Sequence, residues 1–284
     1  MSEIVNQPSI LATYNHHSHD DNIRFYQQGH KYEILDDKFS KYTSVTTWVH
    51  ANFEKFNADA VIKNIMNGKN WAPGHKYWGM TPTQISLMWK NTGTESATAG
   101  TKLHAQIEDF MNNRDISPHY HHQQLYDAYK AQCIDDTQCA AEWNYFIQFV
   151  RDHPHLKPYR TEWMVYDKQY KIAGSIDMVY ETQDGHLEIY DWKRSKEIIR
   201  SSDWNKTSNN PLISHVPDTN YWHYALQLNT YRHLLEKNYG KKVTKLCLVR
   251  LHPNNENETY EILDVPIMDK EIHLLFDELL RSKS

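Results

Sequence analysis

The stretch from Ile172 to Lys196 reads IAGSIDMVYETQDGHLEIYDWKRSK, and it holds two β-prone runs joined by a turn. Residues 171–181 and 186–193 are rich in β-branched and aromatic side chains, and Asp184-Gly185 between them is a typical hairpin pair. A third run of the same kind, TEWMVYD at 161–167, comes just before them. Three such runs in succession predict a β-meander.

The last of these runs carries charges at its end. Asp191 and Lys193 are two residues apart, so both side chains point to one face of a strand. Leu187 and Ile189 have the same parity. The strand is therefore expected to begin in the core and to end with a carboxylate beside an ammonium group at the edge of a cleft.

The middle run places Asp177 among apolar residues, where an ionised carboxylate is costly unless it is paired or binds a cation. Asp177 and Asp191 on adjacent strands, with a backbone carbonyl such as that of Trp192, would give Mg²⁺ or Mn²⁺ the oxygen ligands it prefers. Lys193 would then orient water or neutralise charge on a phosphate. The alternative is structural: a D-x-K triplet arises often by chance, and its charges can form surface ion pairs.

Helical patterns surround the strands. Residues 97–111 place apolar side chains at helical spacing, with His104 and Glu108 one turn apart beside that stripe. Further helices are predicted at 122–150, 221–239 and 269–280, with Gly240 ending the second. Two more strands are expected at 245–252 and 259–265, and the polar stretch 198–220 is expected to cover the cleft as a loop.

The N-terminal third shows weaker patterns. Residues 1–22 lack an apolar period and predict a poorly ordered arm. The stretches RFYQQGHKYEIL and YTSVTTWV predict a hairpin around Asp36-Asp37, followed by a helix at 58–67. In residues 70–93, tryptophans and tyrosine alternate with lysines and histidine. These aromatics either stack on single-stranded nucleic acid or pack a helix onto the core.

Composition excludes several classes of protein. A formal net charge of −5 confines any nucleic-acid site to a local patch. No window is apolar enough for a membrane helix, and the first residues lack a signal-peptide pattern, so a soluble, intracellular protein without a membrane partner is expected. Three cysteines cannot supply the four ligands of an iron–sulfur cluster. No Walker A pattern is present, so no use of ATP is expected.

The order of these motifs resembles the PD-(D/E)XK nucleases, in particular the branch of RecB-type domains, lambda exonuclease and the mitochondrial genome maintenance exonuclease. The matching segments are GTKLH at 100–104, TEWMV at 161–165, IAGSIDMVY at 172–180, LEIYDWKRSK at 187–196 and YALQLNTYRHLLE at 224–236. YTSVTT at 42–47 is similar to a β segment of exonuclease-like members and of proteins of large DNA viruses, which leaves a viral or phage origin open.

The resemblance implies roles for individual residues. Asp177 and Asp191 match the metal-binding acids, Lys193 the catalytic lysine and His104 a further metal ligand. Glu162 matches an acid at the start of the sheet and is counted with the catalytic residues. For contact with DNA the resemblance and the charges together indicate five residues: Gln227, Tyr231, Arg194, Lys196 and Ser44.

The resemblance also implies an α/β fold with a central mixed β-sheet flanked by helices, that is, a restriction-endonuclease-like core with helical N-terminal additions. We expect one nuclease domain over 1–284, divided into the arm 1–22, a hairpin and aromatic segment 23–95, the core 96–266 and a C-terminal helix 267–284. Its expected activity is hydrolysis of DNA with Mg²⁺ or Mn²⁺, at ends or single strands, in DNA repair, recombination or replication. The rivals are a non-catalytic DNA-binding module and an enzyme acting on a small phosphorylated substrate.

Overall fold

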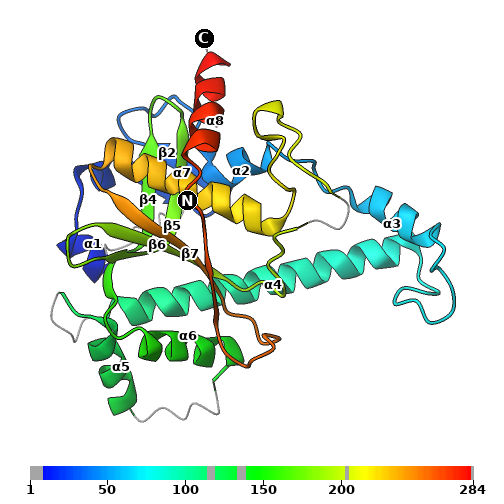
Figure 1. Ribbon diagram of the computed structural model, residues 1–284, viewed down its shortest axis with the longest axis horizontal. Helices are drawn as coiled ribbons and strands as arrows, with labels where there is room; N and C mark the ends of the chain where they lie inside the picture. The colour runs from blue at the N-terminus through cyan, green and yellow to red at the C-terminus, as the bar shows by residue number, and fades with distance from the viewer. Residues whose placement is uncertain (1–8, 114–118, 133–138, 202–204, 283–284) are drawn as a thin grey trace.

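A mixed β-sheet between two layers of helices forms the body of the protein, in a computed structural model that describes residues 9–113, 119–132, 139–201 and 205–282 (Figure 1). The central strands are those of the expected meander: β4 (Lys157–Asp167), β5 (Ile172–Glu181) and β6 (Leu187–Lys193). Gly185 in the β5–β6 turn has φ of 77°, a conformation that favours glycine. The α/β fold with a mixed sheet and flanking helices is thus confirmed.

Further strands join this sheet, some parallel and some antiparallel to their neighbours. The sheet has the order β3-β5-β6-β7-β8, and β4 pairs with the other edge of β5. β6 and β7 are parallel, whereas β4 and β6 are each antiparallel to β5. The other strands of this sheet are β3 (Thr43–Ser44), β7 (Val243–Arg250) and β8 (Glu261–Asp264), whereas β1 (Ile23–Tyr26) and β2 (Lys31–Ile34) form a separate two-stranded sheet.

One edge of β5 is shared between two strands, and this splits the sheet. β3 pairs with Ile172 and Ala173 at the start of β5, and β6 pairs from Met178 onward. Between these two pairings, no described strand pairs with residues 174–177 on this edge. The split ends at Asp177, so it leaves room for polar side chains inside an otherwise apolar sheet.

The helices cover both faces of the sheet. One face packs against α2 (Val45–His50), α7 (Asn220–Asn238) and α8 (Asp269–Arg281), through apolar residues such as Leu228, Leu235 and Phe276. The other face packs against α4 (Pro82–Met111), α5 (His122–Ala131) and α6 (Ala141–Asp152), through Leu103, Phe146 and their neighbours. Both faces of the central strands are therefore buried, as their apolar sequences require.

The N-terminal region corrects two expectations. Residues 9–22 are not a poorly ordered arm: they form α1 (Ile10–Tyr14) and a 3-10 turn (Ser18–Asn22) on β4, where Asp20 accepts hydrogen bonds from Arg160 and Trp163. Residues 1–8 lie outside the described part. The hairpin is β1–β2, which apart from Ile23 lies within RFYQQGHKYEIL and turns at residues 27–30, not at Asp36-Asp37.

The helices differ from the predictions in three places. The stretch at 45–50 is helical despite its β-prone residues, because Ser44 caps it and Val45, Trp48 and Val49 are buried. α4 begins 15 residues before the predicted start at 97, with a capping box at Thr81 and Gln84. The helix predicted at 122–150 is two helices, α5 and α6. α3 (Ala58–Met66) matches its prediction closely. No described helix has the length and apolar character that a membrane span requires.

Candidate metal centre and active site

Three side chains from three elements converge at the end of the split in the sheet: His104 of α4, Glu162 of β4 and Asp177 of β5. One ligand atom of each lies within 4.8 Å of the other two. His104 Nδ1 is 3.7 Å from Glu162 Oε1 and 3.6 Å from Asp177 Oδ2. We call these three residues the acid–histidine cluster.

The backbone of Trp192 holds two members of this cluster. Its N–H donates to Asp177 Oδ2 at 3.0 Å, and its carbonyl oxygen lies 3.0 Å from His104 Nε2. When the ring is neutral and Nε2–H donates to the carbonyl, the Nδ1 lone pair faces the two acids. A ligating histidine commonly has its other ring nitrogen fixed in this way. The Trp192 carbonyl oxygen, which we expected as a metal ligand, thus contacts His104 in this structure.

Glu162 reaches the cluster through an unusual backbone conformation. Thr161 pairs with Met178 and Trp163 pairs with Ile176, so Glu162 lies opposite Asp177. Its φ is 42°, in the left-handed region that side chains other than glycine rarely adopt. Such strain is typical of functional sites. Ser175 Oγ donates to Glu162 Oε2 at 2.9 Å and fixes the carboxylate.

Charges in the cluster are balanced by the histidine. Burial alone would lower the pKa of His104, but Asp177 and Glu162 outweigh it and raise the pKa to about 9. Burial raises the pKa of Asp177, while His104 opposes that shift. Without a metal ion the imidazolium therefore neutralises carboxylates that would otherwise repel each other. A divalent cation can take over that role.

Asp191 and Lys193 form a buried ion pair beside the cluster. Lys193 Nζ is 2.5 Å from Asp191 Oδ2, and the two side chains are 16% and 3% exposed. Burial would lower the pKa of Lys193, but Asp191 and Asp177 outweigh it, so the pKa is raised and the ammonium stays charged. Burial raises the pKa of Asp191 to about 6 against the opposing effect of Lys193.

The sequence patterns assigned no role to three neighbours of this site, although they placed one of them, Glu108, one helical turn from His104. Lys193 Nζ lies 4.3 Å from the ring centroid of Tyr224, a cation–π contact made from α7. Tyr32 of β2 is buried where burial, Glu162 and Asp177 raise the pKa of its hydroxyl. Burial and Glu162 raise the pKa of Glu108 to about 7. Tyr224 is three residues before Gln227, and this helical spacing would have placed it on the same face.

The residues expected to contact DNA lie in different surroundings. Tyr231 is 3% exposed, and a Cβ on Gly174 would meet its ring at 2.8 Å. It is a core residue that hydrogen-bonds Gln227, which is half-buried. Tyr231 therefore positions Gln227 and has almost no surface to offer a DNA strand.

The basic residues after β6 and Ser44 also differ from one another. Arg194 Nε donates to Glu142 Oε1 of α6 at 2.7 Å, so its guanidinium is already paired. Lys196 is exposed. Ser44 is half-buried and caps α2, since its Oγ accepts from Thr47 N at 3.1 Å. Of these three, Lys196 alone presents an exposed side chain.

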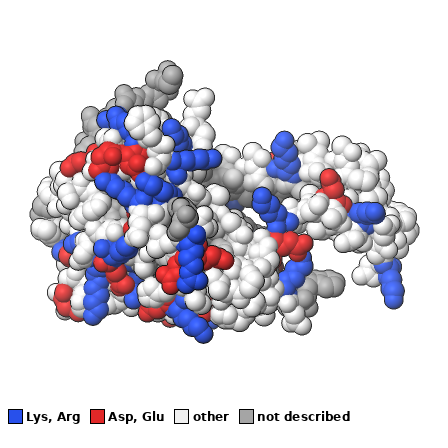
Figure 2. Space-filling model, turned by 90° about the horizontal axis from the view of Figure 1, so that it is seen from above, with Lys and Arg blue, Asp and Glu red and all other residues white. Residues whose placement is uncertain are grey.

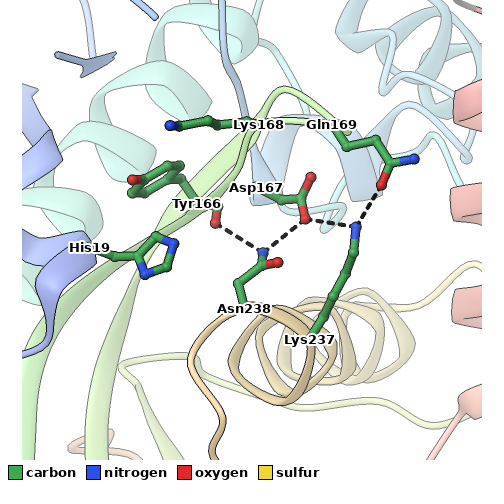
Figure 3. A pocket seen from close by; sticks show the side chains of 7 residues that line it. All are labelled: His19, Tyr166, Asp167, Lys168, Gln169, Lys237 and Asn238. Carbon is green, nitrogen blue, oxygen red and sulfur yellow. Dashed lines mark hydrogen bonds and ion pairs between the residues drawn. The ribbon is translucent and has the colours of Figure 1, made fainter. Parts of the chain in front are cut away.

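A hollow at the end of α7 contains none of these residues (Figure 3). There Asp167 Oδ2 accepts from Lys237 Nζ at 2.9 Å and from Asn238 Nδ2 at 2.8 Å, and Lys237 also donates to Gln169. These polar groups bind one another and join the β4–β5 turn to α7. The hollow is lined by His19, Tyr166, Asp167, Lys168, Gln169, Lys237 and Asn238.

A comparison with protein families agrees with this core. Residues 83–281 match the family model described as the PD-(D/E)XK nuclease superfamily. The search of curated proteins found no match. A solved structure titled "Crystal structure of SSO0001" matches with 18% identity and a TM-score of 0.23, over 44% of this chain and 51% of that chain. The matched region thus spans about half the length of that structure.

Proposed function

Because the chain belongs to the PD-(D/E)XK nuclease superfamily, we propose that it is a metal-dependent deoxyribonuclease whose reaction centre is the acid–histidine cluster with Asp191 and Lys193. The observation that supports this most is the meeting of His104, Glu162 and Asp177 within 4.8 Å beside a buried lysine–carboxylate pair. Buried charges of this kind cost desolvation free energy even when they are paired, so their presence here is consistent with a function.

The donor set fits Mg²⁺ or Mn²⁺. Glu162 and Asp177 offer carboxylate oxygens, which these ions prefer, and His104 Nδ1 adds the nitrogen that Mn²⁺ also accepts. Asp191 is the next carboxylate on β6 and completes the acids around the site. A divalent ion bound there stabilises the negative charge that develops on a phosphate during hydrolysis.

Lys193 has a separate task in this proposal. Its charged ammonium group donates a hydrogen bond to a phosphate oxygen or to the attacking water and orients it. Tyr224 and Asp191 restrict where that group can lie. Because Lys193 is protonated, it acts as a donor and not as the base that takes the proton of water.

Within the superfamily, we assign the chain to the branch of RecB-type domains and lambda exonuclease. Its proposed substrates are DNA ends or single strands, in repair, recombination or replication. The support for this assignment is GTKLH at 100–104, which carries His104, and the helix at 224–236, which carries Gln227. Lys196, Gln227 and Ser44, with Arg194 once it releases Glu142, are the proposed contacts to the DNA backbone. Backbone contacts hold DNA without reading its sequence, so little sequence preference is expected.

The test is cleavage of end-labelled single-stranded, duplex and circular DNA with Mg²⁺ or Mn²⁺. Wild-type protein is compared with Asp191→Ala and Lys193→Ala, after unfolding curves have shown that both variants fold. Cutting that is lost in both variants supports the nuclease, and sparing of circles supports an exonuclease. A folded, metal-loaded wild type that binds DNA and cuts none of these substrates would instead be a non-catalytic DNA-binding module.

A further inference from the structure

Residues 55–90 form a projection, which we call the aromatic lobe, at the far end of α4 (Figure 1). It consists of α3, the following loop and the first turns of α4. Ile62 and Ile85 are 2% and 0% exposed and form its interior, and neither belongs to the apolar clusters around the sheet. From Lys90 to Thr98 every residue of α4 is exposed. A solvent-exposed segment of α4 thus joins the lobe to the body.

Aromatic rings are exposed on this lobe. Phe56 is 73% and Trp78 is 46% exposed. Their rings are held by neighbours, since Phe56 lies 6.1 Å from Trp89 and Trp78 lies 5.5 Å from Trp71 between ring centroids. These rings do not pack α4 onto the core, which was one of the two interpretations of the sequence. Grouped exposed apolar side chains are typical of a binding surface.

The lobe is basic in an acidic chain. Residues 55–90 contain five lysines and one acid, Asp59, a formal charge of +4, so the rest of the chain carries −9. The lysines are exposed, and none forms an ion pair with another described residue. Figure 2 shows the lobe projecting to the right of the body, with lysine side chains spread over it. The five lysines are Lys55, Lys63, Lys69, Lys76 and Lys90.

We infer that the aromatic lobe binds single-stranded DNA and leads it along α4 to the acid–histidine cluster, an inference that rests on the proposed nuclease function. A single strand combines exposed base faces, which stack on aromatic rings, with phosphates, which bind lysines. A duplex hides its base faces, so it would use the lysines alone. The lobe offers both kinds of contact on one surface.

The surface of α4 between the lobe and the site can accommodate a single strand of DNA. Gly93, Ala97, Gly100 and His104 lie at i, i+4, i+7 and i+11, so they form one stripe that ends at the cluster. A Cβ at Gly93 or Gly100 would meet nothing within 4 Å, so packing does not require these glycines. A glycine inside a helix costs about 1 kcal/mol relative to alanine. Because glycine has no side chain, a phosphodiester group of DNA can approach the helix backbone closely at these two positions.

Geometry gives the length of strand that this path needs. Trp89 and His104 are 15 residues apart on one helix, which is about 22 Å at about 1.5 Å per residue. A strand with about 3.4 Å between stacked bases covers that distance with roughly six or seven nucleotides. Shorter oligonucleotides bound at the cluster cannot reach the lobe.

The test measures binding of labelled oligo(dT) by fluorescence anisotropy, with the full chain and with EDTA to prevent cutting. Phe56→Ala/Trp78→Ala is expected to raise the Kd for a 20-mer roughly tenfold or more. Lys69→Gln/Lys76→Gln is expected to reduce the slope of log affinity against log salt by about 1.4. The matched control is Lys38→Gln/Phe39→Ala, where Phe39 is 106% exposed outside the lobe. It is expected to bind as wild type does.

Oligonucleotide length and oligomeric state complete the test. The difference between the aromatic variant and wild type is expected to be largest above roughly seven nucleotides, where one strand can contact both the lobe and the cluster. Gly93→Leu, but not Thr92→Leu, is expected to weaken binding of the 20-mer. The inference is wrong if the lobe variants bind every length as the control does. It is also wrong if light scattering shows that they dissociate an oligomer while DNA binding is unchanged.

Failure of this inference is distinguishable from failure of the proposed function. If wild-type protein binds the 20-mer through the lobe but cuts no DNA with Mn²⁺, the inference about the lobe stands and the proposed nuclease function is wrong. If wild-type protein cuts DNA and the lobe variants bind and cut the 20-mer equally well, the proposed nuclease function stands and the inference about the lobe is wrong.

Discussion

His104 Nε2 lies 3.0 Å from the carbonyl oxygen of Trp192, and this contact turns the other ring nitrogen toward Glu162 and Asp177. The same backbone unit donates its N–H to Asp177. Trp192 lies between Asp191 and Lys193 on β6, so one peptide segment aligns the cluster with the ion pair. The site is therefore organised by backbone groups that side-chain substitution cannot remove.

The first prediction separates metal binding from catalysis. Glu162→Gln and Asp177→Asn keep the side-chain shape but remove a carboxylate, and each is expected to weaken Mn²⁺ binding at least about tenfold. Lys193→Met removes a cation and no ligand, so its Mn²⁺ affinity is expected to equal or exceed that of wild type. Isothermal titration calorimetry measures all three. Equal Mn²⁺ affinity in Asp177→Asn and wild type would contradict the assignment of the cluster.

The second prediction concerns the ring that faces Lys193. Tyr224→Phe retains the cation–π contact, whereas Tyr224→Ala removes an interaction of about 0.5–2 kcal/mol. If Lys193 acts in cleavage, kcat is expected to fall between about twofold and roughly 30-fold in the alanine variant and to change little in the phenylalanine variant. The comparison is made at saturating DNA. Equal kcat in both variants would show that Tyr224 does not position Lys193.

The third prediction concerns packing under the split in the sheet. A Cβ at Gly174 would lie 2.8 Å and 2.9 Å from Tyr231 Cε1 and Oη, and 3.0 Å from Val45 Cγ2. Gly174→Ala is therefore expected to lower the free energy of unfolding by about 1–3 kcal/mol. Gly93→Ala, in open space on α4, is the matched control and is expected to raise it by up to about 1 kcal/mol. Urea unfolding of both variants tests the contrast.

The fourth prediction concerns pH. Burial lowers the pKa of His122 from 6.5 to about 3, and His122 Nε2 hydrogen-bonds Tyr180 Oη at 2.9 Å. His122 binds a proton near pH 6.5 in the unfolded chain but stays neutral in the folded chain. The free energy of unfolding therefore falls as pH falls from 6.5 toward 3. Between pH 7.5 and 5.5 this amounts to about 1.4 kcal/mol. His122→Gln is expected to lose that much less stability over this interval, as measured by urea unfolding at both pH values. An equal loss in variant and wild type would show that His122 is not buried in its neutral form.

Local patterns were enough to predict the meander, because β4, β5 and β6 have buried side chains along most of their length and a clear turn between the last two. The same patterns failed at α2, where Val45, Thr46 and Thr47 favour a strand in isolation. Packing of Trp48 and Val49 against α7 and the sheet, together with the Ser44 cap, overrides that preference. Its helical form is a tertiary effect that no local window contains.

The candidate site divides in the same way. The alternation of LEIYDWK was sufficient to place Asp191 and Lys193 on one face, and Asp177 stood out as an acid in an apolar run. The positions of Tyr224 and Tyr32 depend on how α7 and β2 pack on the sheet. The strained φ of Glu162 likewise arises from its place opposite Asp177. Helical spacing puts Tyr224 on the face of Gln227, but its contact with Lys193 joins distant segments of the chain and cannot be predicted from the local sequence.

Removal and return of the metal test the central claim most directly. One end-labelled DNA oligonucleotide is incubated with wild-type protein in EDTA, then with excess Mn²⁺, and the same sequence is followed for Lys193→Met. We predict no cutting in EDTA, cutting by wild type once Mn²⁺ is added, and a rate at least about 100-fold lower for the variant at equal metal occupancy. Cutting by wild type in EDTA, or equal rates for the two proteins with Mn²⁺, would contradict a metal-dependent nuclease centred on this cluster and Lys193.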